Sequence, residues 1–321
     1  MQDFYAIGHI TNDLNPHPHV SGSVAYAAVM AKQFGYKPTI ITKCKVDHPY
    51  IRDLENLGIK VINLPIRNSI FGDALTTFEN VFDSNGRRKQ KVSNIQEKID
   101  IKDLNYFPKI SSSAIVLVGS VISEISVDLI NFLDKKYKTN FVCQGCFRSV
   151  DVNGYIHASK WPDLEKLRSI HLISISDEDI TIEGKINYSI LSQVKKLADI
   201  TLYTLGEKGS IIYTKNGTED IIKPFKLSTN EVIELSGSGD IYTTAYILAL
   251  NKNHDVKEAA VVASLVAALK IRAGCNKDNY GLKSCSSKKD IDLFINKNKE
   301  RFFAFLESNK LLTDTNIINS L

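Results

Sequence analysis

Short apolar runs alternate along the chain with longer segments in which apolar residues recur every three or four positions. Such short runs are typical of strands in a parallel sheet, and the longer segments are typical of helices. The first run, 3–10, is broken by Gly8 and is followed by an Ala-rich segment at 22–31 and a second run at 38–42. A strand, a helix and a strand in this order predict a parallel crossover unit.

The same alternation resumes after residue 114. We expect strands at 114–119, 140–142, 171–175, 200–205 and 210–214, and helices at 127–137, 164–168, 187–197, 240–251, 255–273 and 288–309. Neither a repeat of fixed period nor a low-complexity linker divides the chain. The pattern therefore predicts an α/β fold in a single domain, residues 1–321, with a central, mainly parallel sheet flanked by helices.

Residues 73–92 interrupt this alternation. Two β-rich arms, 76–82 and 87–92, flank the sequence DSNG, and Asn-Gly between such arms is a strong signal for a hairpin. Because the arms are polar on one face, we expect a small β lid that stands off the main body, with a second contribution from residues 13–20. An exposed edge of this lid could pair with another subunit, which makes a homodimer a further hypothesis.

Composition and charge narrow the class of protein. Apolar residues make up 43% of the 321 residues and charged residues 24%, which excludes disorder and coiled coil as the main architecture. The net charge of +4 is small and dispersed, so we expect no binding of nucleic acid. A leader segment and a membrane-spanning run are both absent from the pattern, so a cytoplasmic protein without membrane contact is expected. The five cysteines are expected to be free thiols.

The segment 234–242 (ELSGSGDIY) carries the clearest chemical signal. Its two glycines allow backbone N–H groups to converge, and the apolar helix that follows adds the positive end of its dipole. This predicts an anion site made by Gly237, Ser238 and Gly239. Asp240, in the first turn, would stand beside the bound anion and could take a proton from a hydroxyl that attacks a phosphoryl group. A capping role for Asp240 is the alternative.

Three more familiar motifs do not fit. A Walker loop needs GxxxxGK[ST], which neither 234–242 nor 206–210 (GEKGS) contains. A dinucleotide fingerprint needs a third glycine where Tyr242 stands. The CxxC at 143–146 has no further ligands at zinc spacing, so ordinary cysteines at a strand end are favoured over a metal or redox motif.

Four motifs, taken in order, resemble the ribokinase (PfkB) family of carbohydrate kinases. The family signature DTxGAGDxF is similar to ELSGSGDIY at 234–242, and the family's nucleotide-binding TLGxxG occurs unchanged at 204–209. Its GxxxxD matches Gly8 to Asp13, and its GGxxxxxA loop is similar to SGSVAYAA at 21–28. The resemblance covers nearly the whole chain and implies a ribokinase-like fold.

The resemblance implies an ATP-dependent carbohydrate kinase that uses Mg²⁺ and an alcohol as acceptor. It implies Asp240 as general base and residues 237–239 as anion hole. The nucleotide-binding residues that it implies are Thr204, Gly206, Gly209, Ser264 and Gly274. The family's NxxE, which organises Mg²⁺ and phosphate, appears here as SDED at 176–179, so Asp179 and Glu178 become the expected metal ligands.

A narrower resemblance concerns the branch that includes archaeal myo-inositol kinase. It rests on GSVISEI at 119–125, QGCFR at 144–148, FEN at 78–80 and GRR at 86–88, and it implies a sugar or cyclic polyol as substrate. The substrate-binding residues that the two resemblances imply are Asp13, Gly22, Ser23, Asn80, Gln144 and Arg148. For Arg148 a salt bridge is an equal alternative.

Departures from the family pattern keep two other functions open. Ser21 replaces the first glycine of the glycine pair, and Glu234 and Leu235 replace Asp-Thr. A nucleoside kinase would need an aromatic platform, which Tyr26 and Phe78 could supply. A ligand-sensing protein that has lost turnover is the alternative outside enzymes.

Overall fold

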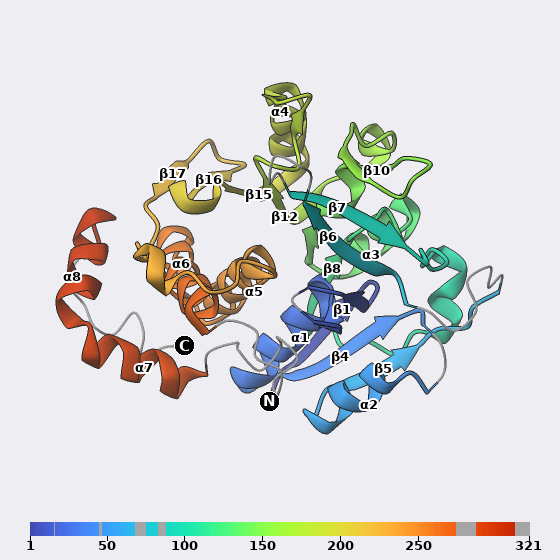
Figure 1. Cartoon of the computed structure of the whole chain (residues 1–321), viewed down its shortest axis with the longest axis horizontal. Helices are drawn as coiled ribbons and strands as arrows, with labels where there is room; N and C mark the ends of the chain where they lie inside the picture. The colour runs from blue at the N-terminus through green and yellow to red at the C-terminus, as the bar shows by residue number, and fades with distance from the viewer. Residues whose placement is uncertain (16, 45–46, 68–74, 83–87, 274–286, 312–321) are drawn as a thin grey trace.

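The computed structural model describes residues 1–15, 17–44, 47–67, 75–82, 88–273 and 287–311 (Figure 1). Its central sheet has nine strands. In spatial order these are β17 (Glu219–Ile222), β16 (Ser210–Thr214), β15 (Ala198–Thr204), β12 (Ile170–Ser176), β9 (Thr139–Val142), β8 (Ile115–Gly119), β1 (Asp3–Ile7), β4 (Lys37–Thr42) and β5 (Lys60–Asn63). Strands β15 to β5 run parallel, and β16 and β17 are antiparallel at one edge. The predicted, mainly parallel sheet is confirmed.

Helices cover both faces of this sheet. Within β1, Phe4 and Ala6 belong to one buried cluster, and Tyr5 and Ile7 belong to the other, as expected for alternating side chains. The first cluster is covered by α1 (Ser23–Gln33), α2 (Pro49–Asn56), α5 (Ser238–Asn251), α6 (Val256–Ala273), α7 (Lys288–Lys297) and α8 (Lys299–Ser308). The second is covered by α3 (Val127–Lys136), α4 (Tyr188–Leu197) and the 3₁₀ turns η1 (Ile101–Tyr106) and η3 (Leu164–Lys166).

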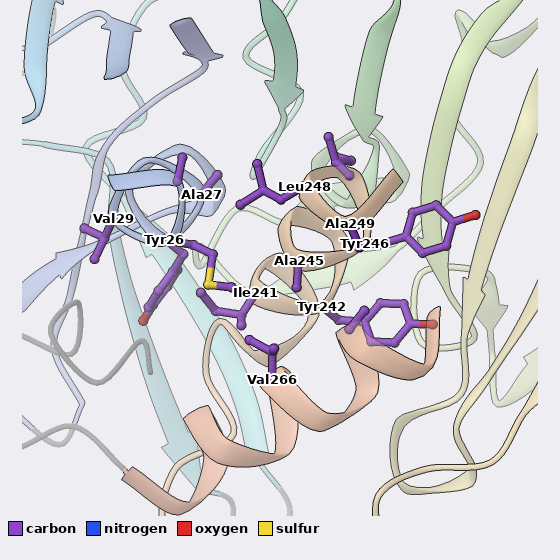
Figure 2. Packing of buried hydrophobic residues seen from close by; sticks show 14 of the residues in the cluster. Tyr26, Ala27, Val29, Ile241, Tyr242, Ala245, Tyr246, Leu248, Ala249 and Val266 are labelled. Carbon is purple, nitrogen blue, oxygen red and sulfur yellow. The ribbon is translucent and has the colours of Figure 1, made fainter. Parts of the chain in front are cut away.

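Helix α5 is the central helix of the first face. In Figure 2 it lies between α1, which contributes Tyr26, Ala27 and Val29, and α6, which contributes Val266. All its residues from 241 to 249 are buried, as expected for a helix that is apolar on every side. The position of its N-terminus is therefore fixed by packing along most of its length.

A second sheet of four strands has the order β3 (His19–Ser21), β2 (Thr11–Asp13), β6 (Thr77–Phe82) and β7 (Arg88–Ser93). Strands β6 and β7 pair antiparallel, as the hairpin pattern predicts, and their turn at 83–87 lies outside the described residues. The edge strand β7 is itself covered: the Val92 N–H donates to Gly154 O at 2.8 Å, between β10 (Arg148–Val150) and β11 (Ile156–Ala158).

Two helix predictions were wrong. The segment 164–168 forms only the short 3₁₀ turn η3. The segment 288–309 is broken into α7 and α8 at Asn298, whose side chain donates to Phe294 O at 2.8 Å. An asparagine side chain that bonds to nearby backbone competes with helix continuation, which explains the break.

The pattern also missed several elements. It did not predict helix α2, the short strands β5, β10, β11 and β17, or the small hairpin of β13 (Thr181–Ile182) and β14 (Lys185–Ile186). The described helices include none that is both long and apolar enough to cross a bilayer.

Candidate functional site

Loops at the carboxyl ends of the parallel strands meet backbone to backbone. A Cβ added to Gly8, just after β1, would stand 2.2 Å from Gly119 O at the end of β8. A Cβ added to Gly145, after β9, would stand 2.4 Å from Val121 C and Ile122 N. Side chains are excluded from these contacts, so the loops after β1, β8 and β9 form one interlocked floor.

The buried carboxylate of Glu124 holds the middle loop of this floor. It accepts hydrogen bonds from Ser120 Oγ at 3.0 Å, from Val121 N at 2.9 Å and from Ile122 N at 2.8 Å. A carboxylate that accepts three bonds is satisfied without water. The loop 120–124 is therefore rigid where it faces the site.

The N-terminus of α5 borders this floor. Gly237 precedes the helix in a left-handed conformation with φ 73°, and a Cβ on Gly237 would stand 2.5 Å from Cζ of Tyr26. A Cβ on Gly239 would meet nothing within 4 Å. The Ser238 N–H, which the sequence predicts to be part of the anion hole, already donates to Leu235 O at 3.1 Å. An anion at this helix start would therefore be held by the N–H groups of Gly237 and Gly239, beside the open face of Gly239.

Two hydroxyl pairs tie α5 to the central sheet. Thr243 Oγ1 lies 2.7 Å from Ser174 Oγ of β12, and the Tyr242 hydroxyl lies 2.6 Å from Ser210 Oγ of β16. Both pairs are buried. Because buried hydrogen bonds fix direction as well as distance, they set the rotation of α5 about its own axis and thus the direction of its first turn.

Asp240 stands in the first turn of α5, partly buried. Burial raises the pKa of its carboxyl to about 6, while the Ser23 hydroxyl and the charges of Arg148 and Lys270 act in the opposite direction. The carboxyl of Asp179 also raises the pKa of Asp240. The structure thus brings together four residues from the sequence prediction, Asp240, Ser23, Arg148 and Asp179, although their roles are not tested by this geometry.

Ser23, at the start of α1, is only 2% exposed. Its Oγ makes no hydrogen bond of full geometry within the described parts of the chain, but it lies close enough to the Asp240 carboxyl to lower the pKa of that group as a hydrogen-bond donor. A buried hydroxyl in this state is unusual, because most buried polar atoms are paired. The arrangement suits a ligand hydroxyl that would bond with Ser23 and Asp240 together.

Arg148 connects Asp240 to the lid sheet. Its Nη1 donates to Val121 O at 3.0 Å, and its guanidinium carbon lies 5.9 Å from the centre of the Phe78 ring in β6. The Arg148 charge also lowers the pKa of Asp179 against the effect of burial. One cation therefore faces both carboxylates and the inner side of the lid.

The other predicted substrate residues lie on the same side of the sheet. Asp13, at the end of β2, is buried and accepts from Asn15 N at 3.2 Å, and Asn80 of β6 donates its backbone N–H to Asn15. Gly22 directly precedes α1, and a Cβ there would stand 2.7 Å from His9 O. Gln144, partly buried, starts the 3₁₀ turn η2 (Gln144–Phe147) after β9.

The predicted metal ligands differ in position. Asp179 is 7% exposed, and its Oδ2 accepts from Ser176 N at 2.8 Å, whereas Glu178 is exposed. Burial is the largest influence on Asp179 and raises its pKa. Among the described residues there is no cluster of three potential ligands. A single carboxylate fits Mg²⁺ that is bound mainly by donor phosphates and water.

The predicted donor turn lies next to the acidic segment. The Asp177 N–H donates to Thr204 O at 3.0 Å, and Leu205 N donates to Gly209 O at 2.8 Å around the turn η4 (Gly206–Lys208). Gly206 has a positive φ and open space for a ligand, whereas a Cβ on Gly209 would stand 2.1 Å from Ile222 O. The turn therefore needs glycine at 206 for its positive φ, and glycine at 209 because the backbone of β17 leaves no room for a Cβ.

The predicted adenine side is only partly visible. Ser264 Oγ of α6 accepts from Phe225 N at 3.0 Å, so its hydroxyl oxygen already serves to hold the segment after β17. Gly274 lies outside the described residues.

Sequence reasoning missed one buried residue next to this site, Lys270 of α6. Its Nζ donates to Ser236 O, and to Glu234 O at 3.3 Å, in the loop that leads into α5. Lys270 is 1% exposed. A lysine inside the apolar run SLVAALKI was the available signal, because lysine is almost never fully buried unless its charge is compensated.

The cysteines of the CxxC motif are buried thiols. Cys143 Sγ donates to Ser174 O at 3.2 Å, and Cys44, Cys143 and Cys146 are all free. Burial raises the pKa of each thiol, that of Cys44 to about 12. A thiol held in this state is a poor nucleophile and metal ligand. Cys275 and Cys285 lie outside the described residues.

Comparison with known proteins finds a family model that matches part of the chain. Residues 146–277 match the model described as "pfkB family carbohydrate kinase". This segment contains the turn at 204–209, the start of α5 and Asp240. The family resemblance expected from the motifs is confirmed by this match.

Two curated relatives are 30% identical to the chain over short segments. One is a 5-dehydro-2-deoxygluconokinase of Clostridium botulinum, aligned over 98 residues, which are 30% of this chain and 26% of that protein. The other is a nucleoside kinase of Methanocaldococcus jannaschii, aligned over 91 residues, which are 28% of this chain and 29% of that protein. The chain therefore spans less than a third of the length of either relative.

A solved structure has the same fold over most of the chain. It is a pyrophosphate-dependent kinase in the ribokinase family, complexed with a pyrophosphate analog and myo-inositol. The TM-score is 0.67 at 21% identity, and the alignment covers 88% of this chain and 99% of that one. The predicted ribokinase-like α/β fold is confirmed.

Proposed function

We propose that this chain, whose residues 146–277 match the pfkB carbohydrate kinases, transfers a phosphoryl group to a hydroxyl of a small sugar or cyclic polyol. The observation that carries the proposal is the position of Asp240 at the start of α5, with the buried hydroxyl of Ser23 and the charge of Arg148 beside it. A base, a hydroxyl-binding group and an anion site share one place.

In this reaction Asp240 acts as general base. The acceptor oxygen forms a bond to the terminal phosphorus of the donor, its proton passes to the Asp240 carboxylate, and the bond from phosphorus to the bridging oxygen breaks. The electron pair of that bond leaves with the shortened donor. A pKa of about 6 keeps most Asp240 carboxyls ionised at about pH 7, yet basic enough to accept the proton.

The phosphoryl group would be held by the first turn of α5. The N–H groups of Gly237 and Gly239 would donate to its oxygens, with the helix dipole adding positive potential, whereas the Ser238 N–H donates to Leu235 O at 3.1 Å. Arg148 would contribute a full charge from the side of the lid. In-line transfer would require the acceptor oxygen, held at Asp240, and the leaving oxygen to lie on opposite sides of the transferred group.

ATP is the proposed donor, bound through Thr204, Gly206 and Gly209 at the turn beside the acidic segment. Asp179 would hold Mg²⁺ with the donor phosphates, with Glu178 as a more exposed alternative. Such an ion, when bound, neutralises phosphate charge. Pyrophosphate is the rival donor, because a structure of the same fold is described as a pyrophosphate-dependent kinase.

A sugar or polyol is favoured over a nucleoside as acceptor. The two aromatic candidates for a base platform are engaged elsewhere: Tyr26 is buried against Gly237, and Phe78 is buried beside the Arg148 guanidinium. The partial similarity to a nucleoside kinase nevertheless makes nucleosides the second candidate class. Homodimer formation through the lid and a cytoplasmic location stay predictions.

The test is a matrix of donors and acceptors. Purified protein with Mg²⁺ is given ATP or pyrophosphate and, in turn, polyols, hexoses, pentoses and nucleosides, and the release of ADP or orthophosphate is measured. We expect one acceptor class to stimulate release from ATP. Asp240→Asn should lower that rate by at least about 10²-fold, as for loss of a general base.

The matched control is Asp128→Asn, which removes an exposed aspartate from the first turn of another helix, α3. It should leave the rate unchanged. If neither donor supports transfer while calorimetry shows that acceptors bind, the ligand-sensing alternative replaces the kinase. If pyrophosphate alone supports transfer, the family function stands and ATP as donor is wrong.

A further inference from the structure

Lys270 places a positive charge inside an apolar helix. It lies near the end of α6, whose buried residues from 259 to 269 are otherwise apolar apart from Ser264. Its side chain is 1% exposed. Burial of an ammonium is costly unless strong acceptors replace its water. We therefore expect Lys270 to contact such acceptors.

Those contacts are with the loop that leads into the anion site. Nζ donates to the backbone carbonyls of Glu234 and Ser236. From the other direction, the N–H groups of Ile233 and Glu234 both approach Ile271 O at 3.2 Å. The loop 233–236, which immediately precedes Gly237, is thus held to the last turn of α6 by hydrogen bonds. The Lys270 ammonium donates two of them.

The ammonium also lies 5.8 Å from the centre of the Tyr26 ring. That ring contacts Gly237 on its face, where a Cβ would stand within 2.7 Å of three ring carbons. The cation, the ring and the glycine turn therefore support one another. The Ser236 carbonyl that accepts from Lys270 belongs to the same peptide unit as the Gly237 N–H, so holding this carbonyl also holds the direction of that N–H.

We propose that Lys270 is a positioning residue, a tethered cation that fixes loop 233–236 so that the N–H groups of Gly237 and Gly239 are aimed at the transferred phosphoryl group. This rests on the proposed kinase function. It acts through the loop and does not touch the reacting atoms. A tethered ammonium has the further consequence that the loop needs no small cation from solution to satisfy the two carbonyls.

The test compares Lys270→Met with Lys257→Met. Both remove a lysine ammonium from α6, but Lys257 is in the first turn, far along the helix from the loop. We expect Lys270→Met to lower kcat at least about tenfold, as for a misaimed anion-site donor, with a much smaller change in KM for the acceptor. Lys257→Met should match the wild type.

Chemical rescue separates positioning from mere stability. Ammonium or methylammonium ions, which can donate to the two carbonyls, should restore kcat of Lys270→Met several-fold at constant ionic strength. Tetramethylammonium, which has no N–H, should not. Unchanged kcat in folded Lys270→Met, or equal effects of all three ions, would overturn the proposal. If the Met variant does not fold, Lys270→Gln, which keeps a shorter neutral donor, takes its place.

A binding measurement keeps this proposal distinct from the kinase proposal. Calorimetry with inorganic pyrophosphate as the probe requires no turnover. Weaker binding to Lys270→Met than to Lys257→Met, by about tenfold, supports the aimed anion site even if the wild type shows no transfer. Equal binding to both variants, with equal kcat, contradicts it.

Discussion

The ring of Tyr26 closes one side of Gly237, so that a Cβ at Gly237 would stand 2.5 Å from Tyr26 Cζ and 2.6 Å from Cε2. Gly237 also has a φ of 73°, which disfavours any residue with a Cβ. Conformation and contact therefore both require glycine. The first residue of the predicted anion site is therefore specified by a side chain more than two hundred positions away in the sequence.

Gly237→Ala tests this relationship. The change should lower the free energy of unfolding by about 1–2 kcal/mol for the left-handed backbone and by about 1–3 kcal/mol more for the clash with Tyr26. The control is Gly184→Ala, because Gly184 has a φ of 75° and nothing within 4 Å of its added Cβ. Urea unfolding of both variants gives the comparison, and equal losses would show that the ring gives way freely.

Asp240→Asn should stabilise the protein while it removes activity. The carboxyl has a pKa of about 6 in the fold and about 3.9 when unfolded. The folded state therefore binds the extra proton between these values, and stability falls as pH rises through this range. Above about pH 6 the Asn variant should be more stable by about 1–3 kcal/mol, and below about pH 4 the gain should vanish. Thermal unfolding of the wild type and of Asp240→Asn at both pH values tests this, and an equal difference in stability at both would contradict it.

Arg148→Met should shift the acidic limb of the pH–rate profile to higher pH. The groups that face Asp240 are Ser23, Arg148 and Lys270, which lower its pKa, and Asp179, which raises it. Without the Arg148 charge the base would become protonated at a higher pH, so activity should fall more at about pH 6 than at about pH 8.

Phe78→Leu is the matched control for this prediction. It removes the ring beside the guanidinium but keeps the charge near Asp240. Its acidic limb should stay where it is in the wild type, measured as kcat/KM against pH. A limb that moves equally in both variants would mean that lid packing, and not the charge of Arg148, controls Asp240.

The three buried thiols should resist alkylation. Iodoacetamide attacks thiolates, and burial raises the pKa of Cys44, Cys143 and Cys146 above the usual value. Peptide mass mapping should find these positions unmodified in the native protein and modified after unfolding in urea. Rapid modification of Cys143 or Cys146, or a disulfide between them, would contradict the structural interpretation of this motif.

Local patterns predicted the main fold well because strand and helix periods are written directly in the order of residues. The parallel strands other than β5, and the helices α3, α4, α5 and α6, were expected within a few residues of their observed ends. Breaks that depend on one side chain were missed, as at Asn298, where a hydrogen bond to Phe294 O ends a helix that periodicity alone would continue.

The candidate site shows the same division. Asp240 and the glycine turn could be named as candidates from the sequence because their chemistry lies in one short segment, and their roles stay predictions. Lys270 and the Gly237–Tyr26 contact were missed because each depends on residues from different helices, which only the packing of α1, α5 and α6 brings together. Contacts of this kind leave no periodic trace in the sequence.

The interlocked floor beneath the site also bears on how the molecule can diversify. Gly8 and Gly145 meet other backbone with no room for a side chain, and a Cβ on Gly119 would stand 2.8 Å from the Cβ of Ser23. Mutation of these glycines would therefore break the framework before it altered any preference for a ligand. Variation that changes which ligand is accepted is therefore confined to the surrounding walls, at residues such as Asn80 and Gln144. The fold thus separates a floor that tolerates no side chains from walls that can vary. Design of a new ligand selectivity should leave the glycines of the floor unchanged.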